Sequence, residues 1–257
     1  MVSDAPAFGS WEAESIRFTV FPHPGWEQPV TSPTVWESLG GPPLRTMDIP
    51  GNGLATFVGA EGGTQITMTI RPDRIDWDLR AEPPNQPQWA TPAPLTLPDP
   101  TVALDQGKAI VNAWFHSNFA SEAIRLAFGA VLLSRADGLQ EGFDELNDYI
   151  KVDGYSKDVS DFLYQVNRRR PSSVLPFITM NRLARWTVRE FYTLSVTVGP
   201  PSGPQVETPS AGFASVLELD MSTTADPQLP IDPVICAELF QELATLGTEI
   251  AVEGDIE

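Results

Sequence analysis

Arginine is the residue type with the clearest capacity for chemistry in this chain. Six of its 16 basic residues fall within positions 168–189, close in sequence to the aromatic residues Tyr164 and Trp186. Guanidinium groups hold phosphate or carboxylate through paired hydrogen bonds, and aromatic rings stack on the bases of a single strand. One hypothesis is therefore that this segment binds phosphate, a nucleotide or single-stranded RNA. The six are Arg168, Arg169, Arg170, Arg182, Arg185 and Arg189.

The opposite hypothesis pairs these arginines with the protein's own carboxylates. From Phe191 to its last residue the chain has 11 acidic residues and no basic ones, and the formal net charge is −18. Domains that read nucleic acids usually carry net positive charge, and the field of so acidic a chain repels duplex DNA. We therefore favour internal ion pairs, and we expect neither duplex DNA nor an anionic membrane as a partner.

Carboxylates are densest at Asp73, Asp76 and Asp78. On a strand, Asp76 and Asp78 point to the same face, where two carboxylates could bind a hard cation or divide acid and base roles. Spacing fixes no third ligand, and the outer face of an antiparallel strand is normally polar. We therefore interpret the pair as a solvent-facing surface, with a metal-dependent enzyme as the alternative.

Other catalytic motifs are missing from the sequence. His23 and His116 are the only histidines, and no Gly-x-Ser-x-Gly turn accompanies them. Cys236, the only cysteine, lies in an amphipathic segment without a neighbouring base, which indicates a buried structural thiol. The Gly-rich stretch Gly59–Gly63 lacks the Lys-Ser/Thr of a phosphate-binding loop. We expect no cofactor and no metal, and we lean away from an enzyme.

The elements that position these residues follow from proline content and periodicity. Sixteen of the 25 prolines lie in residues 1–100, and none lies between Thr101 and Arg170. Because proline interrupts helices and central strands, we expect a proline-rich β region with ordered loops over 1–100. An α+β region over 101–257 follows, unless both form one continuous domain.

Alternation of apolar and polar residues predicts a hairpin from Thr64–Ile70 and Ile75–Leu79, with Trp77 on its buried face. The same pattern places Trp186 and Arg189 on opposite faces of a later strand. Residues 151–170 fit either a strand or a helix, and Gly199–Gly212 is expected to be a loop. Further strands are expected at Ser15–Phe21, Leu54–Val58, Ala123–Leu133 and Phe213–Met221, and helices at Thr101–His116 (with Thr101 as its N-cap), Gly138–Ile150 and 232–252.

This order predicts an α+β fold, with antiparallel hairpins and a sheet packed against three helices. Each half of the chain ends in a strand and a helix, so a two-part pseudo-repeat is also expected. The C-terminal helix carries an apolar stripe, which would cover the core or form the seam of a homo-oligomer. The stripe consists of Ile235, Leu239, Leu243, Leu246 and Ile250.

Compartment and origin follow from composition. Residues 1–6 lack the basic and apolar parts of a secretory signal, and the longest apolar run is too short to cross a bilayer. Cytoplasm is therefore the expected location. Lysine is scarce, at three residues, while Arg, Ala, Pro and Gly are abundant, as in bacterial or phage proteins from GC-rich genomes; adaptation to high salt is the alternative explanation of an acidic, lysine-poor chain.

These observations favour a non-catalytic, acidic protein-interaction module, such as an antidote, an inhibitor or an accessory subunit of a bacterial or phage defence or toxin system. A basic protein would be its natural electrostatic partner. Four tryptophans in the proline-rich part would be interface anchors or would pin loops to the core. They are Trp11, Trp26, Trp36 and Trp89. Phosphate, nucleotide or RNA binding through Arg168–Arg189 is the alternative function.

Overall fold

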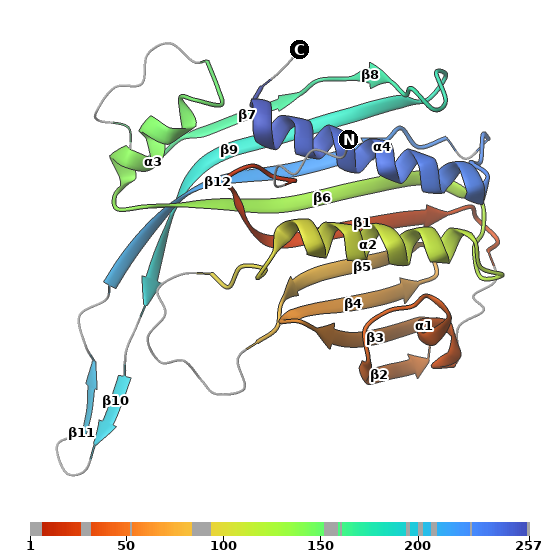
Figure 1. Cartoon of the computed structure of the whole chain (residues 1–257), viewed down its shortest axis with the longest axis horizontal. Coiled ribbons are helices and arrows are strands. Elements are labelled where there is room, and N and C mark those ends of the chain that lie inside the picture. Colours follow the sequence, from red (N-terminus) through yellow and green to blue (C-terminus); the bar gives the residue numbers. More distant parts are fainter. Residues whose placement is uncertain are drawn as a thin grey trace.

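The protein is a two-layer α+β structure in which helices cover one face of a large antiparallel sheet (Figure 1). The expected fold class is therefore confirmed. The computed structural model describes residues 7–26, 32–51, 53–83, 94–151, 159, 161–193, 196–199, 203–206, 210–226 and 228–255.

Within the described residues the sheet has ten strands, with the order β2-β3-β4-β5-β1-β6-β12-β9-β7 and with β8 beside β9; β10 and β11 form a separate hairpin. The strands are β1 (Glu12–Pro22), β2 (Leu44–Gly51), β3 (Leu54–Glu61), β4 (Thr64–Arg71), β5 (Arg74–Ala81), β6 (Ala123–Ala136), β7 (Leu163–Asn167), β8 (Arg170–Pro171), β9 (Thr179–Thr193), β10 (Val196–Gly199), β11 (Gly203–Val206) and β12 (Ser210–Thr223). The helices are α1 (Thr34–Ser38), α2 (Pro100–Phe115), α3 (Leu139–Leu146) and α4 (Pro233–Glu253).

The order of strands and helices is similar in the two halves of the chain, the first from β1 to α2 and the second from β6 to α4. In each half, the first strand (β1 or β6) lies at the centre of the sheet and is followed by a short helix (α1 or α3). Later strands then return inward, so that the last one (β5 or β12) pairs with the first, and a long helix (α2 or α4) closes the half. This is the expected two-part repeat. One sheet and one main apolar cluster run through both halves.

Equivalent contacts mark the centre of the repeat. Phe18 of β1 lies opposite Phe128 of β6, with ring centroids 5.3 Å apart. A Cβ atom added to Gly107 of α2 would lie 2.5 Å from the Phe18 ring, and one added to Gly247 of α4 would lie 2.6 Å from the Phe128 ring. Each long helix therefore uses a glycine to approach a central phenylalanine closely.

Both long helices also begin at an Asp-Pro pair. The Asp99 carboxylate accepts hydrogen bonds from the Thr101 and Val102 amides, and the Asp232 carboxylate accepts one from Val234. The expected N-cap at Thr101 is therefore wrong, because Asp99 supplies the capping oxygen and Pro100 is the first helical residue.

The hairpin expected around Trp77 is β4–β5, and the Trp77 side chain is fully buried against Trp114 of α2, with centroids 5.5 Å apart. Helix α3 ends at Leu146, earlier than expected, although Ile150 remains buried. The undecided segment contains the strand β7, and the expected loop from Gly199 contains β11. Helix α1 and strand β2 were not expected from the sequence.

Helix α4 packs on β6, β12 and α2, and it buries four residues of its apolar stripe, from Leu239 to Ile250. Because the chain's own sheet covers this stripe, it is not free to form an oligomer seam. None of the helices in the described ranges combines the length and the apolar character needed to cross a bilayer.

Candidate binding surface on the open sheet face

Strand alternation gives the sheet a second face, opposite the helices. One row across this face runs through Asp78, Arg17, Gly129, Asp220 and Leu183, on β5, β1, β6, β12 and β9. All four helices pack on the other face, so within the described ranges no helix covers this one. We call it the open face.

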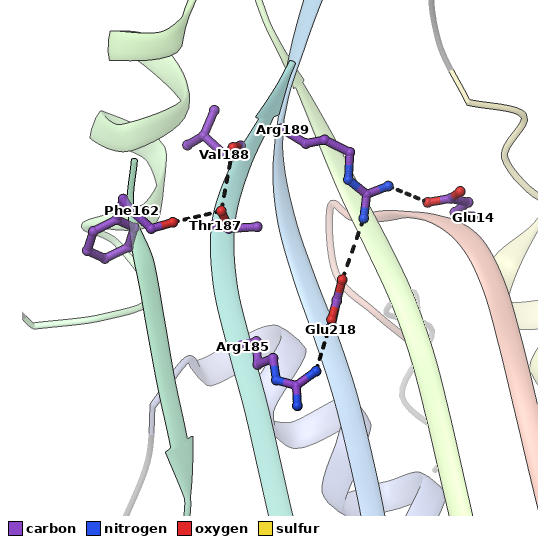
Figure 2. Close-up of polar contacts among 7 residues, drawn as sticks. All are labelled: Glu14, Phe162, Arg185, Thr187, Val188, Arg189 and Glu218. Carbon is purple, nitrogen blue, oxygen red and sulfur yellow. Dashed lines mark hydrogen bonds and ion pairs between the residues drawn. The ribbon is translucent and has the colours of Figure 1, made fainter. Parts of the chain in front are cut away.

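An ion-pair network crosses the open face (Figure 2). Glu218 of β12 lies between two arginines of β9: its carboxylate oxygens are 3.5 Å from Arg185 Nη1 and 3.6 Å from Arg189 Nη2. Arg189 also donates to Glu14 of β1 at 3.0 Å, and Arg185 donates to Gln165 of β7 at 2.6 Å. The network therefore links four strands through ion pairs and hydrogen bonds.

The other arginines of the expected site lie on the helix-covered side, near the end of α4. Arg168 binds Asp255 with two hydrogen bonds of 2.6 and 2.8 Å, and Arg170 Nη2 is 3.8 Å from a Glu249 oxygen. The Arg168 hydrogen bond lowers the pKa of Asp255. Tyr164 also donates to Asp255, which raises the pKa of the Tyr164 phenol.

Arg182 is the most enclosed of the six arginines. Its side chain is 3% exposed, and its Nε and Nη2 atoms have no hydrogen-bond partner in the part of the chain that the structure describes. Desolvation lowers its pKa, and the neighbouring Arg170 adds to this effect. It lines a 10 Å³ cavity beside Asp255, which is about large enough for one water molecule.

The structure therefore does not bring the six arginines together, because the sheet separates Arg185 and Arg189 from Arg168, Arg170 and Arg182. Four of the six form ion pairs with carboxylates, as the internal-pairing hypothesis expects. Arg169 is exposed. Trp186 is 0% exposed beneath Tyr164, so its ring is not available for stacking on a base. The alternative of a single phosphate or RNA site loses its geometric support.

The paired aspartates do share one face, as expected, but Asp76 is not solvent-facing. It is 8% exposed and is held by Arg71, Arg74 and Thr19, each at 2.8 Å. Asp78 pairs with Arg80 at 3.1 Å. In the described ranges, no group of three His, Cys, Asp or Glu side chains is placed to hold a metal ion. Burial raises the pKa of Cys236 to about 12, which suits an inert thiol.

Sequence reasoning missed two concave sites on the open face. One is a 240 Å³ hollow over Gly129, between Arg17 and Asp220. The other is a 160 Å³ apolar groove lined by Pro94, Leu133, Phe191 and neighbouring residues of β12. The sequence did contain a signal for the apolar groove. Strand β6 is apolar on both faces near Leu132 and Leu133, whereas a strand with one solvent-exposed face would alternate apolar and polar residues.

Of the four early tryptophans, Trp11 and Trp36 are buried, and Trp26 packs partly against the core. They pin loops to the core; Trp89 lies outside the described residues. Comparison of the chain with protein-family models and with curated proteins finds no match.

Proposed function

We propose that this chain is a non-catalytic protein-interaction module that binds a protein partner on its open face. The observation that carries this proposal is an apolar patch surrounded by ion-paired arginines. Leu133, Ala214 and Val216 form a cluster there that is at most 1% exposed, and Val131 and Phe191, partly exposed against it, are the apolar surface that a partner can reach. We call these five residues the apolar patch.

The surroundings of the apolar patch have the layout of a protein interface, in which an apolar centre lies inside a polar rim. On one side Arg135 binds Glu12, with its Nε 3.0 Å from the carboxylate, and this pairing lowers the pKa of Glu12. On the other side Arg189 binds Glu14 and lies over the Phe191 ring, 5.8 Å from its centroid. Arginine and phenylalanine are both enriched at interfaces.

Charge favours a basic partner. The net charge is −18, and helix α4 carries acidic residues but no lysine or arginine. Such a field raises the rate of encounter with a basic protein, while the open face supplies the contact itself. An antidote, an inhibitor or an accessory subunit acting on a basic toxin or nuclease would use the chain in this way.

Two neighbouring residues of β9 provide the test. Phe191 faces the apolar patch, whereas Tyr192 points to the opposite side and is 65% exposed. Tagged wild type, Phe191→Asp and Tyr192→Asp would each be used to capture partners from host lysate. We expect the protein retained by both wild type and Tyr192→Asp to be lost with Phe191→Asp, while all three melt alike. Equal capture by both variants would contradict binding on the open face.

A further inference from the structure

The hollow over Gly129 is a second feature of the open face, and it adjoins the apolar patch at Val131. Its volume is 240 Å³, slightly below the range of about 300–1,000 Å³ typical of drug-sized ligands. Gly129 forms the floor of the hollow, and the space above it is open because glycine has no side chain to fill it. The walls are charged, with three arginines and three carboxylates: Arg17, Arg80, Arg185, Asp78, Glu218 and Asp220.

Most of these charges are already neutralised. Asp78 is bound by Arg80, and Glu218 by Arg185. Arg17 and Asp220 differ, because neither forms an ion pair with any residue in the described ranges, and both side chains are exposed. They flank Gly129 in the same row of the sheet, so two strand spacings put their Cα atoms ~10 Å apart.

The Arg17 side chain leans over the floor of the hollow. Its Nη2 atom is 3.8 Å from the position that a Cβ of residue 129 would occupy. A guanidinium and a carboxylate therefore line the hollow on strands at either side of a glycine, with room for a small molecule. Such a pair matches a ligand that carries both charges close together.

We propose that this hollow binds a free α-amino acid. The ligand carboxylate accepts hydrogen bonds from the Arg17 guanidinium, and the ligand ammonium donates to the Asp220 carboxylate. A longer peptide separates its two terminal charges, whereas a free amino acid carries both on one small molecule that fits the hollow. The assigned contacts, Arg17 and Asp220, lie outside the apolar patch, so amino-acid binding and partner binding are tested by different variants.

The test uses L-alanine as the probe, titrated into the full chain and followed by amide NMR shifts. We expect saturable shifts at Arg17, Gly129 and Asp220. N-acetyl-L-alanine lacks the ammonium and L-alaninamide lacks the carboxylate, so each loses a charge-assisted contact and binds at least about tenfold more weakly. Equal binding of either capped analogue, or shifts that do not saturate, would overturn the proposal.

Variants sharpen this test. Gly129→Val fills the hollow and abolishes binding, and its matched control is Ala127→Val, on the same strand and the same face but outside the hollow. The Cβ of a valine at residue 129 would lie 3.2 Å from the Leu219 carbonyl oxygen, so Gly129→Val also crowds the neighbouring strand. Arg17→Gln and Asp220→Asn are therefore used as second variants. Both are exposed, so they keep the fold and weaken binding at least about tenfold. Unchanged affinity in these two variants would contradict the assigned contacts.

Discussion

The two faces of the sheet are made by the same strands but have opposite chemistry. On the central strand β6, Phe128 is fully buried beneath α4, and the next residue, Gly129, forms the floor of an open hollow. The helix-covered face excludes water around aromatic rings, whereas the open face displays ion pairs in solvent. Stability therefore depends mainly on the helix-covered face, the proposed binding uses the open face, and substitutions one residue apart can separate the two.

The largest effect is expected at Trp77, on the helix-covered face. Trp77→Ala removes a fully buried ring and leaves a cavity, which costs about 3–5 kcal/mol in the free energy of unfolding. Trp77→Phe is the control, and it costs less because the Trp77 indole N–H has no partner within the described residues. Denaturant unfolding measures both variants, and an unchanged midpoint for Trp77→Ala would contradict the packing of β5 against α2.

A second comparison uses two glycines. Gly247→Val pushes a side chain into the Phe128 ring, and such overpacking costs about 1–3 kcal/mol. Gly129→Val, on the open face, is expected to cost less, since valine suits a strand and its Cβ would lie 3.2 Å from the Leu219 carbonyl oxygen, against 2.6 Å from the Phe128 ring at residue 247. Equal destabilisation by both would show that the open face is as closely packed as the other.

Arg168 and Arg169 are neighbours with different surroundings. Arg168→Ala leaves the mostly buried Asp255 carboxylate without its ion pair, which costs about 1–2 kcal/mol after allowance for solvent screening. Arg169→Ala, at an exposed residue, is the control and is expected to be neutral. Thermal melts of both variants measure the difference. Salt-sensitive RNA binding by the wild type, lost in an Arg168, Arg169 and Arg170 triple alanine variant that melts normally, would revive the phosphate-site alternative.

The ion pair between Arg168 and Asp255 also predicts how the stability of the fold depends on pH. Because the pKa of Asp255 is lowered in the folded state, its stabilising contribution is complete above the unfolded-state pKa of 3.8 and is lost as the pH falls below that value. Melting temperatures measured from pH 7 down to about 3 therefore fall less steeply for Arg168→Ala than for wild type. Parallel curves would show that Asp255 contributes nothing to the acid sensitivity.

The smallest effect is expected at Arg185, on the open face. Its pairing with Glu218 spans 3.5 Å between partly exposed side chains, and such surface pairs contribute about 0–1 kcal/mol. Arg185→Ala is therefore expected to shift the melt only slightly, and added salt reduces the shift further. A loss larger than that of Arg168→Ala would reverse the assignment of the two faces.

Much of the fold could be predicted because the alternation of apolar and polar residues along a strand is visible in a short stretch of sequence. The hairpin around Trp77 and the helix after Asp232 follow from spacing alone. Strand alternation also placed Trp186 and Arg189 on opposite faces, which the structure confirms, and it could have separated Arg182 from Arg185. The segment after Gly199 could not be predicted as a hairpin, because its prolines and glycines mask the β pattern.

The sequence by itself determined the α+β class, the acidic charge and the absence of recognisable catalytic motifs, because these depend on composition and short-range periodicity. Only the tertiary structure decided that β1, β6 and β12 lie side by side. That arrangement places Arg17 and Asp220, more than two hundred positions apart, on either side of Gly129. Strand pairing of this kind depends on how distant apolar faces pack together, and no local pattern encodes which strands become neighbours.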